Sequence, residues 1–308
     1  MPQTRSEADH HHPLLYLSLT DAKAIGPLDC LESLSAANCL NALHADLSCY
    51  PNDLSERRIN GIQFGNEFCE RLLPTQRDVS RITDWCQSRN LTFSFATPML
   101  ADKGIAQLAK LLGLLPAQCE VVCNDFGVLR LVTQGFHGLQ PVAGRQLCKM
   151  IKDPRLPSAD WAKAIPPGLQ SSLFVRMLHR FNISSLETDV RPFADTTDFE
   201  PNGLDLSVHI PFGYTLKGRI CRPGSLHLSK QKKFTPGHSC QKECLSYFGK
   251  MERTGKQSPH ELKAFTRGNS IFYHYADEQQ RVLKHAINKG WVKRLILAGD
   301  WHENRRSH

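Results

Sequence analysis

Short runs of apolar and β-branched residues recur along the chain, and turn residues bound most of them. Runs of about four to eight such residues are typical of buried strands. We expect strands at LLYLSL (14–19), GIQFG (61–65), LTFSFAT (91–97), CEVVCND (119–125), LQPVAG (139–144), ISSLETDV (183–190), LDLSVHIPF (204–212), SIFYHYA (270–276) and RLILAGD (294–300).

Between these runs, apolar residues recur three and four positions apart, which is the spacing of a helix with one buried face. Helices are expected in 29–43, 101–115, 126–136, 169–181 and 277–290. Strand and helix therefore alternate, which predicts a parallel sheet covered by helices. Because eight or nine strands can close a barrel, we expect an α/β fold of the TIM-barrel type, in one domain over 13–308.

Two stretches interrupt this alternation. Residues 150–168 are rich in proline and have no clear period, so we expect a surface loop. Residues 217–256 carry ten Lys or Arg against two Glu, and this net charge of +8 equals the formal charge of the whole chain. The basic segment 217–256 is either a solvated loop or a positive rim that attracts an anionic substrate, an acidic partner or a metal cluster.

Composition is that of a globular protein, since 41% of the residues are hydrophobic and 22% are charged. No apolar run approaches the roughly 18 residues that a membrane helix needs, and the first residues lack the apolar part of a secretory signal. We therefore expect a cytoplasmic protein without a membrane span, with a disordered leader over 1–12. In that reducing compartment, eleven cysteines indicate buried thiols and metal ligands rather than disulfides.

Four of the cysteines lie after predicted strands, where the chemistry of a barrel gathers. Cys69 follows GIQFG, and Cys221 follows LDLSVHIPF with its extension GYTLKGRI. Cys240 and Cys244 come next in the basic segment, four residues apart, so on a helical turn they share one face. These four cysteines are the candidate metal ligands. The other cysteines lie inside predicted elements or have no partner at ligand spacing, which indicates structural thiols.

The residues alone leave the metal open. Structural zinc usually draws on closely spaced pairs such as C-x2-C. Here the one close pair has three residues between its cysteines, and Cys69 and Cys221 are remote from it. This pattern suits an iron–sulfur cluster assembled from separate loops better than a zinc knuckle. The simpler alternative is four free thiols.

Polar residues near the predicted strand ends are candidate substrate contacts. They are Asp125, Arg145, Glu187, His209 and Tyr214. Side chains at such positions also cap helices or bind the backbone, which is the alternative for each of them. No dinucleotide fingerprint, phosphate-binding loop, GxSxG elbow or HExxH pair occurs, so nucleotide-dependent and hydrolytic chemistry lose support and no catalytic residue is assigned.

Several stretches resemble the collagenase-like peptidase family, and within it the UbiU/UbiV branch. They are GIQFGNEFCERLLPT (61–75), SFATPML (94–100), VVCNDFGVLRLV (121–132), LQPVAGRQL (139–147), GRICRPG (218–224) and SCQKEC (239–244). The cysteine after an early strand favours the UbiV-like members of the branch. The gap between Cys221 and Cys240 is longer than the family pattern, and KQKKF lies in it.

The resemblance implies a 4Fe–4S cluster bound by Cys69, Cys221, Cys240 and Cys244. It also implies a part in dioxygen-independent hydroxylation during ubiquinone biosynthesis, as a heterodimer with a UbiU-like partner. Two alternatives come from the basic segment: an RNA-hydroxylating relative, and a zinc-stabilised scaffold that binds RNA or protein. A peptidase ranks last, because the sequence offers no mechanism for it.

Overall fold

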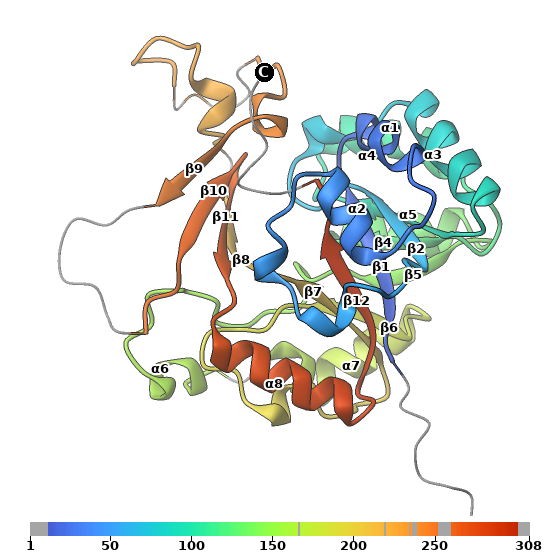
Figure 1. Ribbon diagram of the computed structural model, residues 1–308. Helices are drawn as coiled ribbons and strands as arrows, with labels where there is room; N and C mark the ends of the chain where they lie inside the picture. The colour runs from blue at the N-terminus through green and yellow to red at the C-terminus, as the bar shows by residue number, and fades with distance from the viewer. Residues whose placement is uncertain are drawn as a thin grey trace, which may run out of the picture.

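Eight parallel strands form a closed barrel (Figure 1) in the computed structural model, which describes residues 12–165, 167–218, 220–233, 235, 239–251 and 260–300. The barrel strands are β1 (Leu14–Leu19), β2 (Gly61–Gly65), β3 (Thr92–Thr97), β4 (Glu120–Cys123), β5 (Gln140–Ala143), β6 (Ser185–Thr188), β7 (Asp205–Ile210) and β12 (Val292–Ala298). Their order around the barrel is β1-β12-β7-β6-β5-β4-β3-β2. The predicted TIM-barrel-like α/β fold is confirmed.

Helices surround the barrel. They are α1 (Ile25–Asp29), α2 (Ala36–Ala42), α3 (Gln76–Ser88), α4 (Asp102–Leu112), α5 (Phe126–Gly135), α6 (Ala159–Lys163), α7 (Ser172–Arg180) and α8 (Asp277–Asn288). The helix expected over 29–43 is shorter than predicted, because Ser35 caps α2 by accepting from the N–H of Asn38. Helix α3 was not predicted, although Thr75 and Asp78 form a capping box at its start.

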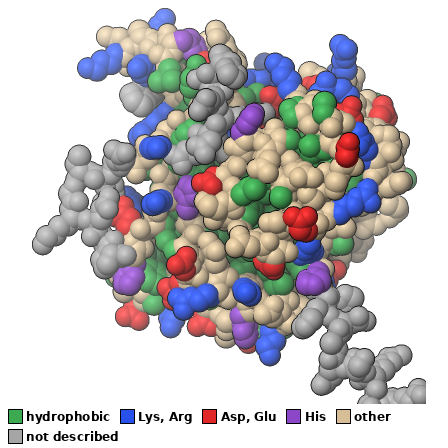
Figure 2. All heavy atoms as spheres, in the orientation of Figure 1, with side chains coloured by type: hydrophobic (Ala, Val, Ile, Leu, Met, Phe, Trp, Pro, Cys, Tyr) green, Lys and Arg blue, Asp and Glu red, His purple; other side chains and the backbone are tan. Residues whose placement is uncertain are grey.

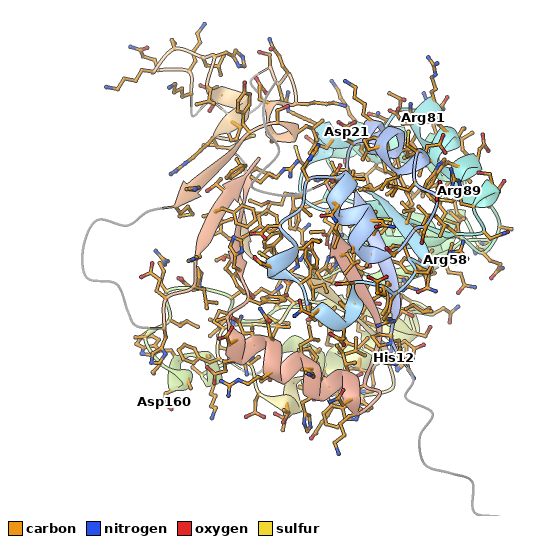
Figure 3. All side chains as sticks on the ribbon, viewed as in Figure 1. His12, Asp21, Arg58, Arg81, Arg89 and Asp160 are labelled. Carbon is orange, nitrogen blue, oxygen red and sulfur yellow. The ribbon has the colours of Figure 1, made fainter. Side chains whose placement is uncertain are left out.

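The main hydrophobic core lies between the strands and the helices. Leu15, Leu17 and Leu19 of β1 are fully buried there. Helix α3 packs close to the loop after β1, where Arg81 donates a hydrogen bond to the carbonyl of Ala22 (Figure 3). Because side chains alternate along a strand, the residues between these leucines point into the barrel.

A second sheet stands beside the barrel (Figure 1). It is antiparallel, in the order β8 (Phe212–Lys217), β11 (Ser270–His274), β10 (Ala264–Arg267) and β9 (Phe248–Met251). The prediction of a barrel strand at 270–276 is wrong, because Gly268 (φ +60°) and Asn269 join β10 to β11 in a tight turn. A parallel pair would need a crossover of about a dozen residues. The run LDLSVHIPF also splits, between β7 and β8.

Aromatic side chains fill the space between this sheet and the barrel. The small core consists of Phe68, Phe212, Tyr214, Phe265 and Phe272. Phe68 comes from the loop after β2, and its ring lies 5.2 Å from those of Tyr214 and Phe272. The loop that carries Cys69 is thereby fixed against the second sheet.

The stretch 150–168 is only partly the surface loop that the sequence predicts. It contains the short helix α6. The side chain of Lys152 is buried, where it forms an ion pair with Asp189 that is described below. In the basic segment, the described residues form single helical turns at Pro223–Ser225 and Glu243–Leu245 and the strand β9. Figure 2 shows Lys and Arg side chains on that part of the molecule.

Two further predictions concern the start of the chain and membranes. Except for His12, the leader predicted over 1–12 lies outside the described residues. Among the described helices, none has both the length and the apolar character that a membrane crossing requires.

Candidate metal centre

Three separate loops carry the four candidate cysteines. Cys69 lies four residues after β2 and directly before the helical turn Glu70–Leu72. Cys221 follows β8, and Cys240 and Cys244 flank the start of the turn Glu243–Leu245. Asn269, in the turn between β10 and β11, donates to the carbonyls of both Phe68 and Gly218 at 3.0 Å. This amide therefore joins the loop of Cys69 to the end of β8.

The four thiols lie near one another. A methyl group placed on Gly224 would be 3.2 Å from the sulfur of Cys221 and 3.5 Å from that of Cys240. The thiols of Cys221 and Cys244 are in hydrogen-bonding contact, and Cys69 interacts electrostatically with Cys221, Cys240 and Cys244. We refer to Cys69, Cys221, Cys240 and Cys244 as the cysteine cluster.

Backbone N–H groups point at two of these sulfurs. Gly224 donates to the Sγ of Cys221, and Lys242 donates to the Sγ of Cys240, each at 3.3 Å. Lys242 has a left-handed backbone (φ +61°), which costs a residue with a side chain about 1 kcal/mol. N–H donors of this kind stabilise thiolate sulfur, because they place positive partial charge beside it.

Arg267 anchors the turn that carries Cys244. Its buried guanidinium donates to the carbonyls of Cys244 at 2.9 Å and Leu245 at 3.3 Å. The same group donates to the carbonyl of Asp300 at 2.9 Å, beyond the end of β12. One side chain of β10 thus ties the cysteine cluster to the barrel.

Burial disfavours the thiolate form of three of these cysteines. It raises the pKa of Cys69 and that of Cys240. The hydrogen bond with Cys221, together with burial, raises the pKa of Cys244 strongly. A bound metal would have to replace these protons, since only thiolates are ligands.

Five of the seven remaining cysteines are buried, as the structural role predicted for them requires. Cys39, Cys86, Cys119, Cys123 and Cys148 are buried in the main core. Cys119, directly before β4, and Cys123, its last residue, both pack on the helix-facing side of the strand, as their even spacing predicts. Cys30 is exposed, and Cys49 is partly buried.

The spacing of the sulfurs tests which metal the cysteine cluster fits. In the described part of the chain, no three of the four sulfurs lie within 4.8 Å of one another. Ligand atoms of Glu67, Glu187 and His209 do meet that limit. One tetrahedral zinc ion would hold its sulfurs about 3.8 Å apart, because Zn–S bonds are about 2.3 Å long. One zinc ion bound by all four cysteines would therefore require the sulfurs to move closer together.

A network of buried charges occupies the mouth of the barrel beside the cysteine cluster. Arg145 contacts Glu67 through Nη2 at 2.7 Å and Asp189 through Nη1 at 2.6 Å. Lys152 contacts the second oxygen of Asp189 at 2.6 Å and lies 3.9 Å from the ring centre of Tyr214. Burial alone would raise the pKa of Asp189, but Arg145 and Lys152 lower it to about 2.

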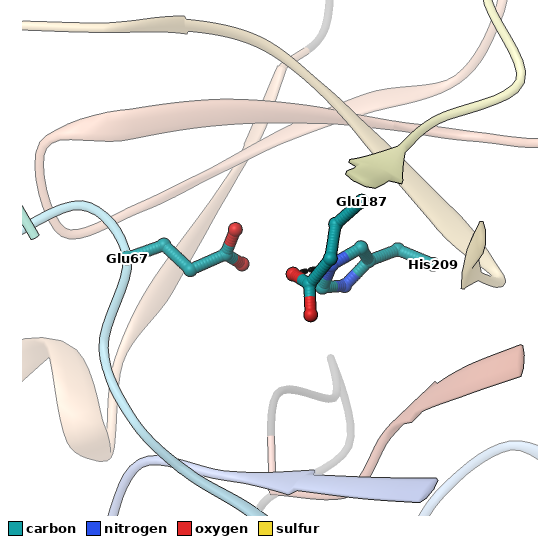
Figure 4. Close-up of side chains that lie close together, drawn as sticks. All are labelled: Glu67, Glu187 and His209. Atoms are coloured by element: carbon teal, nitrogen blue, oxygen red, sulfur yellow. Dashed lines mark hydrogen bonds and ion pairs between the residues drawn. The ribbon is translucent and has the colours of Figure 1, made fainter. Parts of the chain in front are cut away.

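Glu187 of β6 and His209 of β7 lie side by side next to this network (Figure 4). The Oε2 of Glu187 and the Nε2 of His209 are 2.8 Å apart, and Gln63 of β2 donates to the Oε1 of Glu187. Burial raises the pKa of Glu187 to about 8, and burial and Arg145 lower the pKa of His209 to about 4. Burial thus favours the uncharged form of both groups in the metal-free chain.

The structure thus brings four of the five predicted substrate contacts together. Arg145, Glu187, His209 and Tyr214 all lie at the barrel mouth, where Tyr214 donates to the carbonyl of Arg145 at 3.3 Å. Asp125 lies apart from them. Its carboxylate accepts from the N–H groups of Gly127 and Leu100, and it caps helix α5. Asp125 is therefore a helix cap, which was the alternative to a substrate contact.

Sequence reasoning missed Gln63, Glu67 and Lys152. Gln63 lies between Ile62 and Phe64, which pack in the main core, so its side chain points into the barrel. Interiors of such barrels are usually filled by Val, Ile and Leu. The signal for Gln63 was therefore a polar residue between two apolar residues of a buried strand. Lys152 lies in a stretch without any period, so the sequence offered no such signal for it.

The sequence matches no family model and no curated protein. Among solved structures, the U32 peptidase Mk0906 has a TM-score of 0.40 and 10% identity, covering 97% of this chain and 96% of that chain. A phosphodiesterase from Oleispira antarctica has a TM-score of 0.33 and 11% identity, covering 64% and 84%. A class V chitinase from Pseudomonas fluorescens has a TM-score of 0.27 and 11% identity, covering 95% and 97%. TM-scores this low assign neither family nor activity.

Proposed function

We propose that the chain is an iron–sulfur protein of the UbiU/UbiV branch of collagenase-like peptidases. Its cysteine cluster would bind a 4Fe–4S cluster, and the protein would serve dioxygen-independent hydroxylation in ubiquinone biosynthesis as a heterodimer with a UbiU-like partner. One observation carries the proposal: four thiols from three loops lie near one another at one end of the barrel. The family and pathway rest on the sequence motifs.

The chain's own residues would position and shield such a centre. The N–H groups of Gly224 and Lys242 point at sulfur, and Arg267 holds the turn of Cys244. The rings of Phe68 and Tyr214 pack beside the loop of Cys69. When bound, a cluster of this type supplies one-electron redox chemistry, and its potential depends on these donors and on burial.

A groove beside the cysteine cluster offers room for an aromatic substrate. It has a volume of about 390 Å³, which is within the range of small-molecule sites. Apolar Met99 and Leu216 and the edge of Tyr214 line it together with Lys152 and Lys217. Lys217 interacts electrostatically with Cys69, which places the groove next to the thiols. The cavity inside the barrel mouth, at about 40 Å³, is too small for this purpose.

The pathway can be tested by measuring ubiquinone in cells grown without dioxygen. In a host that lacks its own UbiV-like gene, the chain together with a UbiU-like partner should restore ubiquinone, and Cys240→Ser should abolish the effect. Cys30→Ser is the matched control, since that thiol is exposed and lies outside the cysteine cluster. Restoration by Cys240→Ser would contradict the proposal. If the cells instead contain hydroxylated RNA nucleosides and no ubiquinone, the RNA-hydroxylating alternative replaces this proposal.

A further inference from the structure

In the described residues, Glu67, Glu187 and His209 form a group of closely spaced possible metal ligands. One ligand atom from each lies within 4.8 Å of the other two, and all three side chains are buried (Figure 4). A cation about 2.1 Å from each ligand would need separations of about 3 to 4 Å between them, a range that fits inside that limit. The separation of 2.8 Å between Glu187 and His209 would have to widen by a few tenths of an ångström.

A fourth buried acceptor has no partner of its own. None of the described residues donates a hydrogen bond to the Oε1 of Gln63, although the side chain is only 1% exposed. Its amide end lies at Glu187, because the Nε2 of Gln63 donates to that carboxyl group. A buried acceptor without a partner normally costs about 1 to 3 kcal/mol, so it marks a place where a ligand is expected.

The charges and the space around these groups are suited to a cation. With a cation bound, Glu187 would ionise, and the carboxylates of Glu67, Glu187 and Asp189 would then outnumber the basic groups of Arg145 and Lys152. Arg145 fixes Glu67 through Nε and Nη2, which leaves carboxylate lone pairs free. Glu67 and His209 also line the 40 Å³ cavity, which can hold one or more water ligands.

We propose that Glu67, Glu187, His209 and the Oε1 of Gln63 bind one divalent first-row metal ion inside the barrel. Two carboxylates, an imidazole and an amide oxygen form the kind of ligand set that takes Mn²⁺, Fe²⁺ or Zn²⁺ and leaves a position open for water or substrate. This site is separate from the cysteine cluster and contains no sulfur ligand. It therefore does not depend on the iron–sulfur proposal.

Titration with Co²⁺ tests the site, because its spectrum distinguishes the two ligand sets. Bound to oxygen and nitrogen ligands, Co²⁺ shows visible d–d bands without the intense sulfur-to-cobalt charge-transfer band of a thiolate site. We expect the full-length metal-free chain to show such bands for one ion per chain, in addition to any charge-transfer band from Co²⁺ bound at the cysteine cluster. Either Glu187→Gln or His209→Gln should abolish the d–d bands. Glu32→Gln, at an exposed carboxylate, is the control and should keep them.

Gln63→Leu provides a second variant in case the first two fold poorly. It removes one ligand but no charge, and it should weaken Co²⁺ binding by about tenfold to a hundredfold. Circular dichroism confirms the fold of each variant. The proposal is overturned if the wild type shows only the charge-transfer band or no bands, or if Gln63→Leu binds Co²⁺ as tightly as the wild type.

Discussion

Gly224 is a residue at which the cysteine cluster leaves little room for a side chain. A Cβ there would lie 3.2 Å from the sulfur of Cys221, closer than carbon and sulfur normally approach. Its N–H also donates to that sulfur. The absence of a side chain therefore lets this turn approach two ligands at once.

We expect Gly224→Ala to lower the iron content and to speed the loss of iron to a chelator. The added methyl group must displace Cys221, and overpacking of this kind typically costs about 1 to 3 kcal/mol. Iron per chain after anaerobic reconstitution is the measurement. Gly138→Ala is the control, because no atom lies within 4 Å of a Cβ at that position. Equal iron in both variants would contradict the role given to Gly224.

Asp189 makes the stability of the barrel mouth depend on pH. Its pKa is about 2 in the folded chain, below the ordinary value of 3.8, so its contribution is present above about pH 4 and is lost as the pH falls toward 2. Linkage gives this contribution a size of about 2 kcal/mol. Between pH 5 and 3, the free energy of unfolding should fall more for the wild type than for Asp189→Asn. The free energy of unfolding is measured with urea at each pH. An equal fall in both proteins between pH 5 and 3 would show that Asp189 is not held by Arg145 and Lys152.

At the scale of elements, Arg267 is the link between the second sheet, the cysteine cluster and the barrel. Its guanidinium donates to two carbonyls in the turn of Cys244 and to the carbonyl of Asp300, two residues after β12. Removing the guanidinium would leave buried carbonyl groups without this donor.

Arg267→Met should therefore destabilise the chain by about 3 kcal/mol and loosen the turn 243–245. Hydrogen exchange is the measurement, since protection in the described residues 239–251 should fall while protection in β1 and β12 remains. Arg281→Met, at an exposed position of α8, is the control. Unchanged protection in 239–251 would mean that other contacts hold this turn.

The elements also show what the sequence could and could not predict. The barrel strands followed from apolar runs, and Cys69 could be placed because the carboxyl ends of parallel strands meet at one end of a barrel. Strand β11 has the same kind of pattern, so periodicity could not assign it to the second sheet. Its short link to β10 was the usable signal. Lys152 could not be placed, because its partner Asp189 lies 37 residues away and only tertiary folding brings them together.

At the scale of the whole molecule, the barrel and the cysteine cluster have different supports. The barrel closes through its own strands and the main hydrophobic core. By contrast, Cys221, Cys240 and Cys244 lie on a segment whose described residues hold only single helical turns before β9. We therefore expect ligands at the cysteine cluster to order this segment, whereas the barrel does not need them.

Removal of iron should therefore leave the barrel folded. After chelation under anaerobic conditions, we expect the far-ultraviolet circular dichroism to change little, and new protease cleavage sites to appear within 220–251. The same treatment of Cys240→Ser should change nothing further. Global unfolding on chelation would show instead that the metal stabilises the barrel itself.

The most direct test of the account is an iron and acid-labile sulfide count, with a Mössbauer spectrum, on chain prepared without dioxygen. The account predicts about four iron and four sulfide per chain, with loss of both when any one of Cys69, Cys221, Cys240 or Cys244 is replaced by serine and retention in Cys30→Ser. Stoichiometric zinc without sulfide, or neither metal after reconstitution, would contradict it.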